Sequence, residues 1–229
     1  SQSSLFVDIG NSAVKWRSHG SEVFTEEIDQ FSSELLPKAD TVWISAVAHL
    51  NIVEEIKAEF TSVNLVKPSK LYGKLTLSYE DPSKFGVDRF LAMLGALEHF
   101  PNSPLLVIDA GSAVTFDIID AKGIHQGGLI MPGIKALRES FAKFSTNDLS
   151  LKNTELKNNT IEAWQSGTHA MLVSAINSQI QNFELQYPDG VVTICGGIVK
   201  EILIELPLPV KFFDNLVLDG LESYSQSMG

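Results

Sequence analysis

The pattern of hydrophobic and polar positions predicts short strands and helices in an order that occurs twice along the chain. Near the N-terminus, apolar alternation predicts strands that end at Asp8, run through Ala13 to Arg17, and begin again after the turn at 19–21. Farther along this half we expect a helix in the mixed stretch 28–36, a strand at 41–47, a helix at 52–60, a strand at 63–66 and a helix at 86–99. Such a mixture of strands and helices indicates an α/β fold.

Two prolines divide the chain near its middle. Pro101 and Pro104 bracket Asn102 and Ser103, a composition typical of a turn or linker. The second half is predicted to contain strands near 105–109, 113–119 and 124–130, a helix after 132–133, a polar loop at 145–159, a helix at 160–183, a strand at 191–195 and a helix at 198–205. We therefore expect two similar α/β domains, residues 1–102 and 103–229, with a ligand cleft between them.

The two halves also share a short segment. The first copy is Asp8-Ile9-Gly10-Asn11-Ser12-Ala13-Val14-Lys15, and the second is Asp109-Ala110-Gly111-Ser112-Ala113-Val114-Thr115. In each, an apolar strand ends on a carboxylate, turns through glycine and presents a small polar side chain. A carboxylate repels phosphate unless a cation lies between them, so the pattern favours a phosphate-binding hairpin with Mg²⁺ or K⁺ and backbone N–H donors. For either copy alone, the alternative is a turn aspartate that hydrogen-bonds its own backbone.

A second candidate site lies at the start of the predicted helix 86–99. Gly86-Val87-Asp88-Arg89 places a carboxylate beside a guanidinium at a helix N-terminus, which is itself suited to anions. In such a position Asp88 is suited to accept a hydroxyl proton, and Arg89 to hold an acidic substrate. The alternative is structural, because a carboxylate in the first turn stabilises a helix by about 0.3 to 1 kcal/mol.

Three further segments have two interpretations each. Gly127 to Gly133 is either a strand-to-helix turn or a place where backbone approaches a nucleotide, and Cys195-Gly196-Gly197 has the same alternatives. Cys195 itself is expected to pack in the core. Asn158-Asn159-Thr160 is first of all a helix-capping sequence.

Composition and charge narrow the function classes. The 229 residues are 44% hydrophobic and 20% charged, which is ordinary for a folded globular protein. The formal charge of −11 argues against a nucleic-acid or anionic-membrane surface. The single cysteine excludes an intrachain disulfide and a multi-cysteine zinc site. No run approaches the ~20 apolar residues that cross a bilayer, and no basic-then-apolar leader is present, so we expect a cytoplasmic protein.

Taken in order, these segments resemble the type III pantothenate kinases, members of the acetate kinase, sugar kinase, Hsp70 and actin superfamily. Residues 8–15 resemble the family's Asp-x-Gly-Asn-Thr-x-x-Lys phosphate loop, and 109–115 its Asp-x-Gly-Thr-Ala-x-Thr loop. Tyr79, Asp81-Pro82 and 86–89 resemble its pantothenate segment, and 127–133 its Gly-Gly-x-Ile-x-Pro-Gly turn. The departures are mild: Ser12 and Ser112 replace the commoner Thr, and Phe85 a common Leu.

The resemblance implies two RNase H-like (actin-like ATPase) domains with the active site between them, and ATP-dependent phosphorylation of the primary hydroxyl of pantothenate. By this resemblance, Asp88 is the general base and Asp109 holds the monovalent cation, K⁺ or NH₄⁺. The pantothenate site comprises Tyr79, Gly86, Val87, Asp88, Arg89 and Thr160. The ATP site comprises Asp8, Ile9, Gly10, Asn11, Ser12, Ala13, Val14, Lys15 and Ser112, with Mg²⁺ at Asp8.

The resemblance also implies a homodimer in which Thr160 serves either its own or the neighbouring subunit's site. Two alternatives remain open at this stage. One is another kinase or phosphatase of the same superfamily, against which the segment 86–89 argues. The other is a non-catalytic regulatory homologue, an accessory factor for transcription. The presence of Asp8, Asp88 and Asp109 argues against loss of activity, and the acidic charge does not favour contact with DNA.

Overall fold

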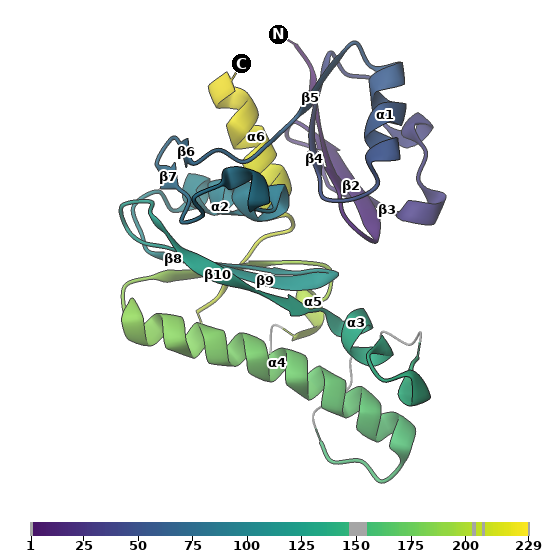
Figure 1. Ribbon diagram of the computed structural model, residues 1–229, viewed down its shortest axis with the longest axis vertical. Coiled ribbons are helices and arrows are strands. Elements are labelled where there is room, and N and C mark those ends of the chain that lie inside the picture. Colours follow the sequence, from purple (N-terminus) through teal and green to yellow (C-terminus); the bar gives the residue numbers. More distant parts are fainter. Residues whose placement is uncertain (1, 147–154, 203–204, 208, 229) are drawn as a thin grey trace.

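The computed structural model describes residues 2–146, 155–202, 205–207 and 209–228. Two five-stranded sheets face each other across a layer of helices (Figure 1). The strand order is β3-β2-β1-β4-β5 in the first sheet and β10-β9-β8-β11-β12 in the second. In both sheets the first three strands in sequence are antiparallel neighbours and the other two add in parallel. The two halves therefore share one topology, as the repeated sequence pattern predicts.

Most elements lie close to their predicted positions, but the strands at 71–72, 75–76 and 211–212 and the helix at 216–228 were not predicted. The first sheet contains β1 (Ser4–Ile9), β2 (Ala13–Ser18), β3 (Phe24–Glu27), β4 (Thr41–Ala46) and β5 (Ser62–Leu65). The second contains β8 (Leu105–Ala110), β9 (Ala113–Ile119), β10 (His125–Pro132), β11 (Val191–Cys195) and β12 (Lys211–Phe212). The helices are α1 (Leu50–Glu59), α2 (Val87–His99), α3 (Ile134–Glu139), α4 (Thr160–Gln186), α5 (Val199–Ile202) and α6 (Leu216–Met228). A small hairpin, β6 (Leu71–Tyr72) with β7 (Leu75–Thr76), lies beside α2.

The alternation of side chains along β1 and β8 decides where their terminal carboxylates point. On β1, the alternate residues Leu5, Val7 and Ile9 pack with α1 on the outer face, whereas Phe6 belongs to the core between the sheets. On β8, the alternate residues from Leu106 to Ala110 pack with α4, while Leu105 and Val107 face the inner core. Because side chains alternate with period two, Asp8 and Asp109 both lie on the inner faces.

Helices α2 and α6 cross closely between the two sheets (Figure 1). A Cβ on Gly220 would lie 1.8 Å from the carbonyl oxygen of Leu91, and one on Gly95 would lie 2.3 Å from that of Leu216. The absence of side chains at these two positions therefore allows the helix backbones to touch. This contact fixes the start of α6 beside the end of β1.

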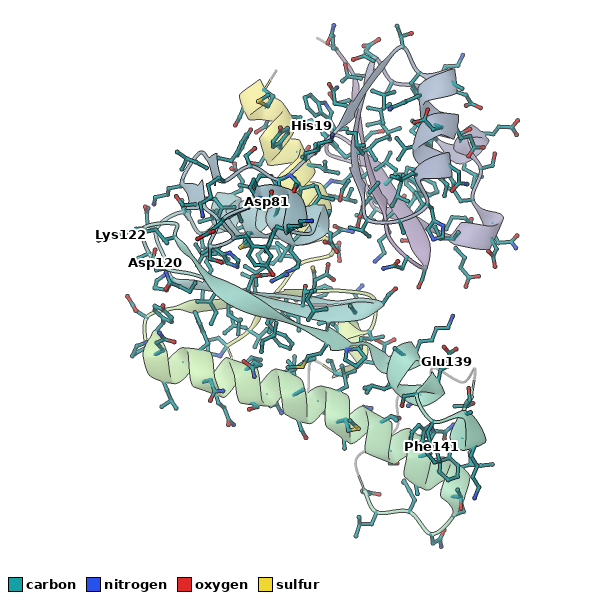
Figure 2. All side chains as sticks on the ribbon, viewed as in Figure 1. His19, Asp81, Asp120, Lys122, Glu139 and Phe141 are labelled. Carbon is teal, nitrogen blue, oxygen red and sulfur yellow. The ribbon has the colours of Figure 1, made fainter. Side chains whose placement is uncertain are left out.

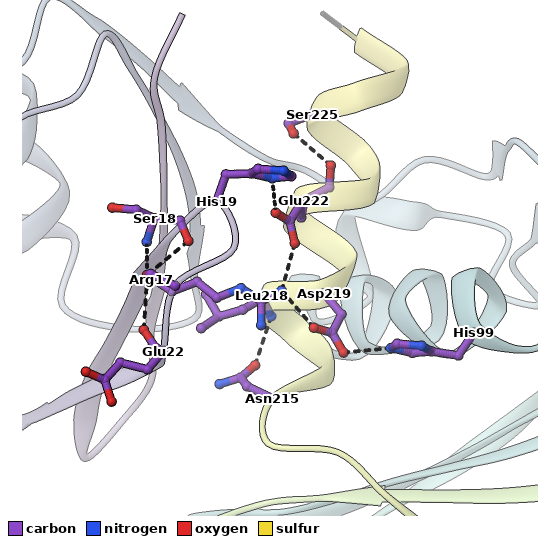
Figure 3. A network of polar contacts seen from close by, with 11 residues as sticks. Arg17, Ser18, His19, Glu22, His99, Asn215, Leu218, Asp219, Glu222 and Ser225 are labelled. Carbon is purple, nitrogen blue, oxygen red and sulfur yellow. Dashed lines mark hydrogen bonds and ion pairs between the residues drawn. The ribbon is translucent and has the colours of Figure 1, made fainter.

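A polar network fastens α6 to the first sheet and to α2 (Figure 3). The Arg17 guanidinium donates to Asp219 at 2.7 Å and to Glu222 at 2.9 Å, and all three side chains are mostly buried. His99 contacts the other Asp219 oxygen at 3.0 Å, and His19 pairs with Glu222. These charges bind the last helix of the chain to its second strand.

Some sequence expectations need correction. The helix expected within 28–36 is replaced by two short 3₁₀ turns, η1 (Ile28–Gln30) and η2 (Ser33–Leu35), because Ser32 caps the second turn by accepting from the Glu34 N–H. The helix expected at 198–205 is the shorter α5, with residues 203–204 outside the described part of the chain. Of the loop expected at 145–159, residues 147–154 lie outside the description. Among the described residues, no helix combines the length and apolar character needed to span a bilayer.

Candidate active site

The two Asp-Gly turns meet in space, as the repeated segment led us to expect. Each turn closes with a backbone bond from its glycine, Gly10 N–H to Ala13 and Gly111 N–H to Ala113, both at 3.0 Å. The exposed hydroxyls of Ser12 and Ser112 lie 2.7 Å apart, one from each turn. Residues about a hundred positions apart in sequence are thus brought into direct contact.

Behind these turns, three carboxylates lie close enough to repel one another. Burial raises the pKa of Asp8 to about 7, and the charges of Asp109 and Asp88 add to this effect while Lys15 opposes it. Burial likewise raises the pKa of Asp109 to about 6, again with Asp88 adding and Lys15 opposing. The pKa of Asp88 is raised by burial as well. The cluster therefore combines an excess of negative charge with limited access to water.

The two copies of the repeat differ in their cross-strand partners. Lys15 on β2 lies opposite Asp8, whereas the corresponding position opposite Asp109 is Thr115. The first turn therefore carries the ammonium group of the cluster, within electrostatic reach of both aspartates. With its lysine, the first turn is suited to bind anionic phosphate oxygens. The second turn, which lacks one, is suited to bind a cation.

Two further side chains support these carboxylates: Asn215, which the sequence did not single out, and Cys195, which was expected only to pack in the core. The Asn215 side chain hydrogen-bonds Asp8 and also caps α6, accepting from the Leu218 N–H at 2.8 Å. Cys195, which is buried as expected, lies opposite Asp109 on β11, and its side chain hydrogen-bonds that carboxylate. A polar residue before the apolar run 216–218 is a capping signal, but nothing in the sequence connects it with Asp8.

Asp88 lies in the first turn of α2, as predicted, and Gly86 precedes the helix as its N-cap. The Asp88 carboxylate accepts from the Arg89 backbone N–H at 2.8 Å. The side chain is partly buried, and Asp8 and Asp109 both lie within electrostatic reach of it. The structure thus brings the start of α2 to the two Asp-Gly turns.

Arg89 has a structural partner that the sequence did not reveal. Its guanidinium is 5% exposed and donates from Nε and Nη2 to the two oxygens of Asp117, at 2.9 and 2.7 Å. Nη1 donates to the Tyr79 hydroxyl at 3.4 Å. Two donor groups of Arg89 are therefore committed to the protein, and the Nη1 side faces the half-buried Tyr79.

Thr160 is not brought to this cluster within the chain. It is the exposed first residue of α4, and Asn159 caps that helix by accepting from the Glu162 N–H at 3.0 Å, as its sequence indicates. This end of α4 packs Trp164 against Phe141, whereas Asp81 lies beside α2 in a distant part of the molecule (Figure 2).

The carboxylates of the cluster are suited to bind cations that are also coordinated by a substrate. In the described part of the chain, no three His, Cys, Asp or Glu side chains gather closely enough to enclose a metal ion. Carboxylates that raise one another's pKa are nevertheless relieved by a bound cation. Mg²⁺ is commonly held by one or two carboxylates together with water and substrate phosphates, which suits Asp8 and Asp109.

A separate cavity of about 480 Å³ opens at the opposite ends of β1 and β4. Its lining includes Ser4, Thr41 and Trp43 but none of the clustered aspartates. The site described here is therefore defined by converging side chains and not by this cavity.

Solved structures share the fold. A Campylobacter jejuni protein described as a candidate Baf family transcriptional activator superposes with a TM-score of 0.65 at 23% identity, over 98% of both chains. MreB5 of Spiroplasma citri bound to ADP gives a TM-score of 0.52 at 11% identity, covering 100% of this chain and 97% of that one. A glucokinase from an Antarctic psychrotroph gives 0.50 at 12% identity, covering 98% and 99%. These likenesses establish the fold of the actin-like ATPases and sugar kinases, as predicted.

Sequence comparison identifies the family. A type III pantothenate kinase from Teredinibacter turnerae is 30% identical over 95% of this chain and 96% of its own length. One from Xanthomonas campestris is 30% identical over 97% of both chains, and one from Colwellia psychrerythraea is 28% identical over 96% and 99%. The family model for type III pantothenate kinases matches residues 4–182, which include both Asp-Gly turns, the start of α2 and its buried partner Asp117. The chain therefore belongs to the type III pantothenate kinase family.

Proposed function

We propose that this protein transfers the γ-phosphoryl group of ATP to the primary hydroxyl of pantothenate, giving 4'-phosphopantothenate, the first step of coenzyme A biosynthesis. Family membership makes the chain a kinase. The observation that carries the proposal further is the convergence of Asp8, Asp88 and Asp109, with Lys15 beside Asp8 and Asp109, because it combines the two repeated turns with the helix start.

Asp88 is the proposed general base. Burial raises the pKa of Asp88, which makes the carboxylate a better proton acceptor than an exposed aspartate. It would accept the hydroxyl proton of pantothenate as the oxygen attacks phosphorus. In a loose phosphoryl-transfer transition state little covalent assistance is needed, so alignment is the larger part of its role.

The ATP phosphates would lie along the first turn. Residues 8–15 supply backbone N–H groups, the Ser12 hydroxyl and the Lys15 ammonium, and the second turn adds Ser112 from the opposite side. These donors face the γ-phosphoryl group as charge develops on its oxygens. Asp8 would hold Mg²⁺ and Asp109 the monovalent cation, K⁺ or NH₄⁺, which together neutralise phosphate charge.

Pantothenate would lie at the start of α2, in an interdomain cleft. The Gly86 and Val87 backbone, Tyr79 and the Nη1 side of Arg89 would orient it. We propose that the protein acts as a homodimer and that Thr160 serves the neighbouring subunit's site. Thr160 is the exposed first residue of α4, and that end of α4 lies far from α2, whose first turn carries Asp88 (Figure 1).

An ATP-consumption assay tests the function. The purified protein is given Mg-ATP and K⁺ with pantothenate, with a panel of common sugars, or with acetate. We expect turnover with pantothenate alone. Consumption with a sugar or acetate and none with pantothenate would overturn the substrate assignment and favour another kinase of the superfamily.

A further inference from the structure

A buried charge network lies directly behind the start of α2. The side chains of Arg89, Asp117 and His125 are 5%, 3% and 0% exposed. Asp117 accepts two bonds from Arg89 and a third contact, at 2.8 Å, from His125 Nε2. A bidentate, fully desolvated pair of this kind fixes a guanidinium in one orientation.

The environment of His125 determines which of its nitrogens carries the proton. The Ser78 backbone N–H points at Nδ1 from 3.2 Å, and the Ser78 hydroxyl lies 3.0 Å from the same atom. A backbone N–H can only donate, so Nδ1 is the acceptor and Nε2 carries the hydrogen that it donates to Asp117. A neutral His125 thus supports Asp117 while Arg89 balances its charge.

A glycine on strand β10 leaves room for this network. A Cβ on Gly128 would lie 2.2 Å from Asp117 Oδ1 and 2.4 Å from Arg89 Nη2. Glycine at this position is therefore required by the ion pair. Gly128, within the turn 127–133, accordingly makes room for the ion pair behind the start of α2, a use that neither sequence interpretation anticipated.

Arg89 transmits its orientation to two residues of the proposed pantothenate site. Its backbone N–H donates to Asp88, and its Nη1 donates to the Tyr79 hydroxyl. The Phe85 ring lies 4.4 Å from the guanidinium carbon and packs edge-on against both Tyr79 and His125. A shift of the guanidinium would therefore change its hydrogen bond to Tyr79 and the charge that acts on Asp88.

We propose that Asp117 and His125 are positioning residues for the acceptor half of the site. Together they hold Arg89, and through Arg89 they hold Tyr79 and Asp88 against pantothenate. This inference rests on the proposed function. It assigns a role in catalysis to two residues that touch neither substrate.

Steady-state kinetics of matched variants test the role. For Asp117→Asn, which leaves a buried guanidinium without its counter-charge, we expect the KM for pantothenate to rise at least about tenfold and the KM for ATP to stay within about twofold. His125→Phe keeps the ring packing and removes the donor, so we expect a smaller change of the same kind. His125→Gln keeps an N–H donor and should restore the KM toward the wild-type value.

The control is Thr193→Val, which removes another buried polar group of the same sheet, a hydroxyl that donates to Leu106 at 3.0 Å. We expect it to lower the melting temperature without separating the two KM values. The proposal would be overturned if the His125 variants changed the KM for pantothenate and the KM for ATP equally, or if His125→Phe kept the wild-type KM for pantothenate. It would also be overturned if Thr193→Val raised the KM for pantothenate and not the KM for ATP. The His125 variants decide it even where Asp117→Asn fails to fold.

A spectroscopic readout separates this proposal from the proposed function. Nitrogen-15 NMR of the wild-type protein should show His125 with hydrogen on Nε2 and none on Nδ1, and a hydrogen on Nδ1 would contradict the network whatever the substrate is. If pantothenate is not phosphorylated, the proposed function fails alone. The same variants are then assayed with the acceptor that the wild-type protein does phosphorylate. The KM for that acceptor must rise while the KM for ATP stays near its wild-type value.

Discussion

At the scale of single residues, the site is dominated by negative charge that the protein alone does not neutralise. Lys15 opposes the raised pKa values of Asp8 and Asp109, and Arg89 opposes that of Asp88. This arrangement lowers the stability of the ligand-free protein. Bound cations recover that stability, because they bind where the protein has left negative charge uncompensated. The residues are therefore arranged for binding and catalysis at the expense of stability.

Substitution of Asp8 should stabilise the ligand-free protein. The pKa of Asp8 is raised from 3.8 to about 7 in the folded state, so the folded protein binds this proton more tightly than the unfolded chain. The free energy of unfolding therefore falls as pH rises from about 4 to about 7. Asp8→Asn removes this loss. At pH 8 without Mg²⁺ or ATP, we expect a gain of about 2 kcal/mol, since one pKa unit corresponds to about 1.4 kcal/mol and partial exposure reduces the effect.

Urea unfolding at pH 4, 6 and 8 measures this. The difference between wild type and Asp8→Asn should be small at pH 4 and grow toward pH 8. The exposed Asp189→Asn serves as control and should stay within about 0.5 kcal/mol of wild type throughout. A variant that is less stable than wild type at pH 8 would show that the Asp8 charge is compensated in the folded state.

The individual site residues were predictable where the signal is local. The repeated segment, a strand that leads to Asp and then Gly, marked Asp8 and Asp109, and a first-turn carboxylate marked Asp88. The partners Asp117 and Asn215 were not predictable, because their contacts join residues 28 and 207 positions apart in sequence. Pairings of this kind arise from tertiary packing and leave no periodic trace.

At the scale of elements, the crossing of α2 and α6 sets the position of the site. Helix α2 carries Asp88, and the start of α6 carries Asn215, which contacts Asp8. The crossing therefore couples Asp88, the proposed base, to the first Asp-Gly turn. Helix α6 was missed from the sequence because Gly220 interrupts its apolar pattern, although that glycine is the residue that lets it pack.

Alanine at Gly220 should force the two helices apart. The added carbon would lie 1.8 Å from the Leu91 carbonyl oxygen, and overpacking of this kind costs about 1 to 3 kcal/mol or more. We expect the melting temperature to fall by about 4 to 10 °C, and the turnover number to fall with it because Asp88 moves relative to Asp8.

Gly167→Ala provides the matched control, since Gly167 is exposed on α4 and a Cβ there meets nothing within 4 Å. It should raise stability by about 0.5 to 1 kcal/mol through helix propensity. Equal melting temperatures for Gly220→Ala and wild type would contradict the close crossing.

At the scale of the whole molecule, the two sheets have the same topology but differ in the charge that faces their aspartates. The first strand of each sheet carries an inward aspartate one residue before its end, yet only the first sheet places a lysine opposite it. We propose that, because of this asymmetry, the Asp-Gly turn of the first sheet binds the ATP phosphates and that of the second sheet binds the monovalent cation. The division into domains 1–102 and 103–229 stays a prediction: the two sheets lie on either side of it, while α6 packs against α2 across it.

Replacing K⁺ by Na⁺ should reduce turnover. Asp109 with its backbone neighbours is proposed to hold a large monovalent cation, and the smaller Na⁺ would not neutralise the phosphate oxygens from the same position. We expect at least about a tenfold loss, because a misplaced cation stabilises the charge of the transition state less well. Turnover in K⁺, NH₄⁺ and Na⁺ at constant ionic strength measures this, and equal rates would remove the cation role of Asp109.

The central claim is that Asp88, held between the two Asp-Gly turns, removes the hydroxyl proton of pantothenate. Its most direct test is the turnover number of Asp88→Asn with pantothenate, Mg-ATP and K⁺, measured beside Glu98→Gln at the other end of α2. We predict a loss of about 10² to 10⁴ for Asp88→Asn with an unchanged circular dichroism spectrum, and wild-type turnover for Glu98→Gln. Turnover of Asp88→Asn within about threefold of wild type would contradict the account.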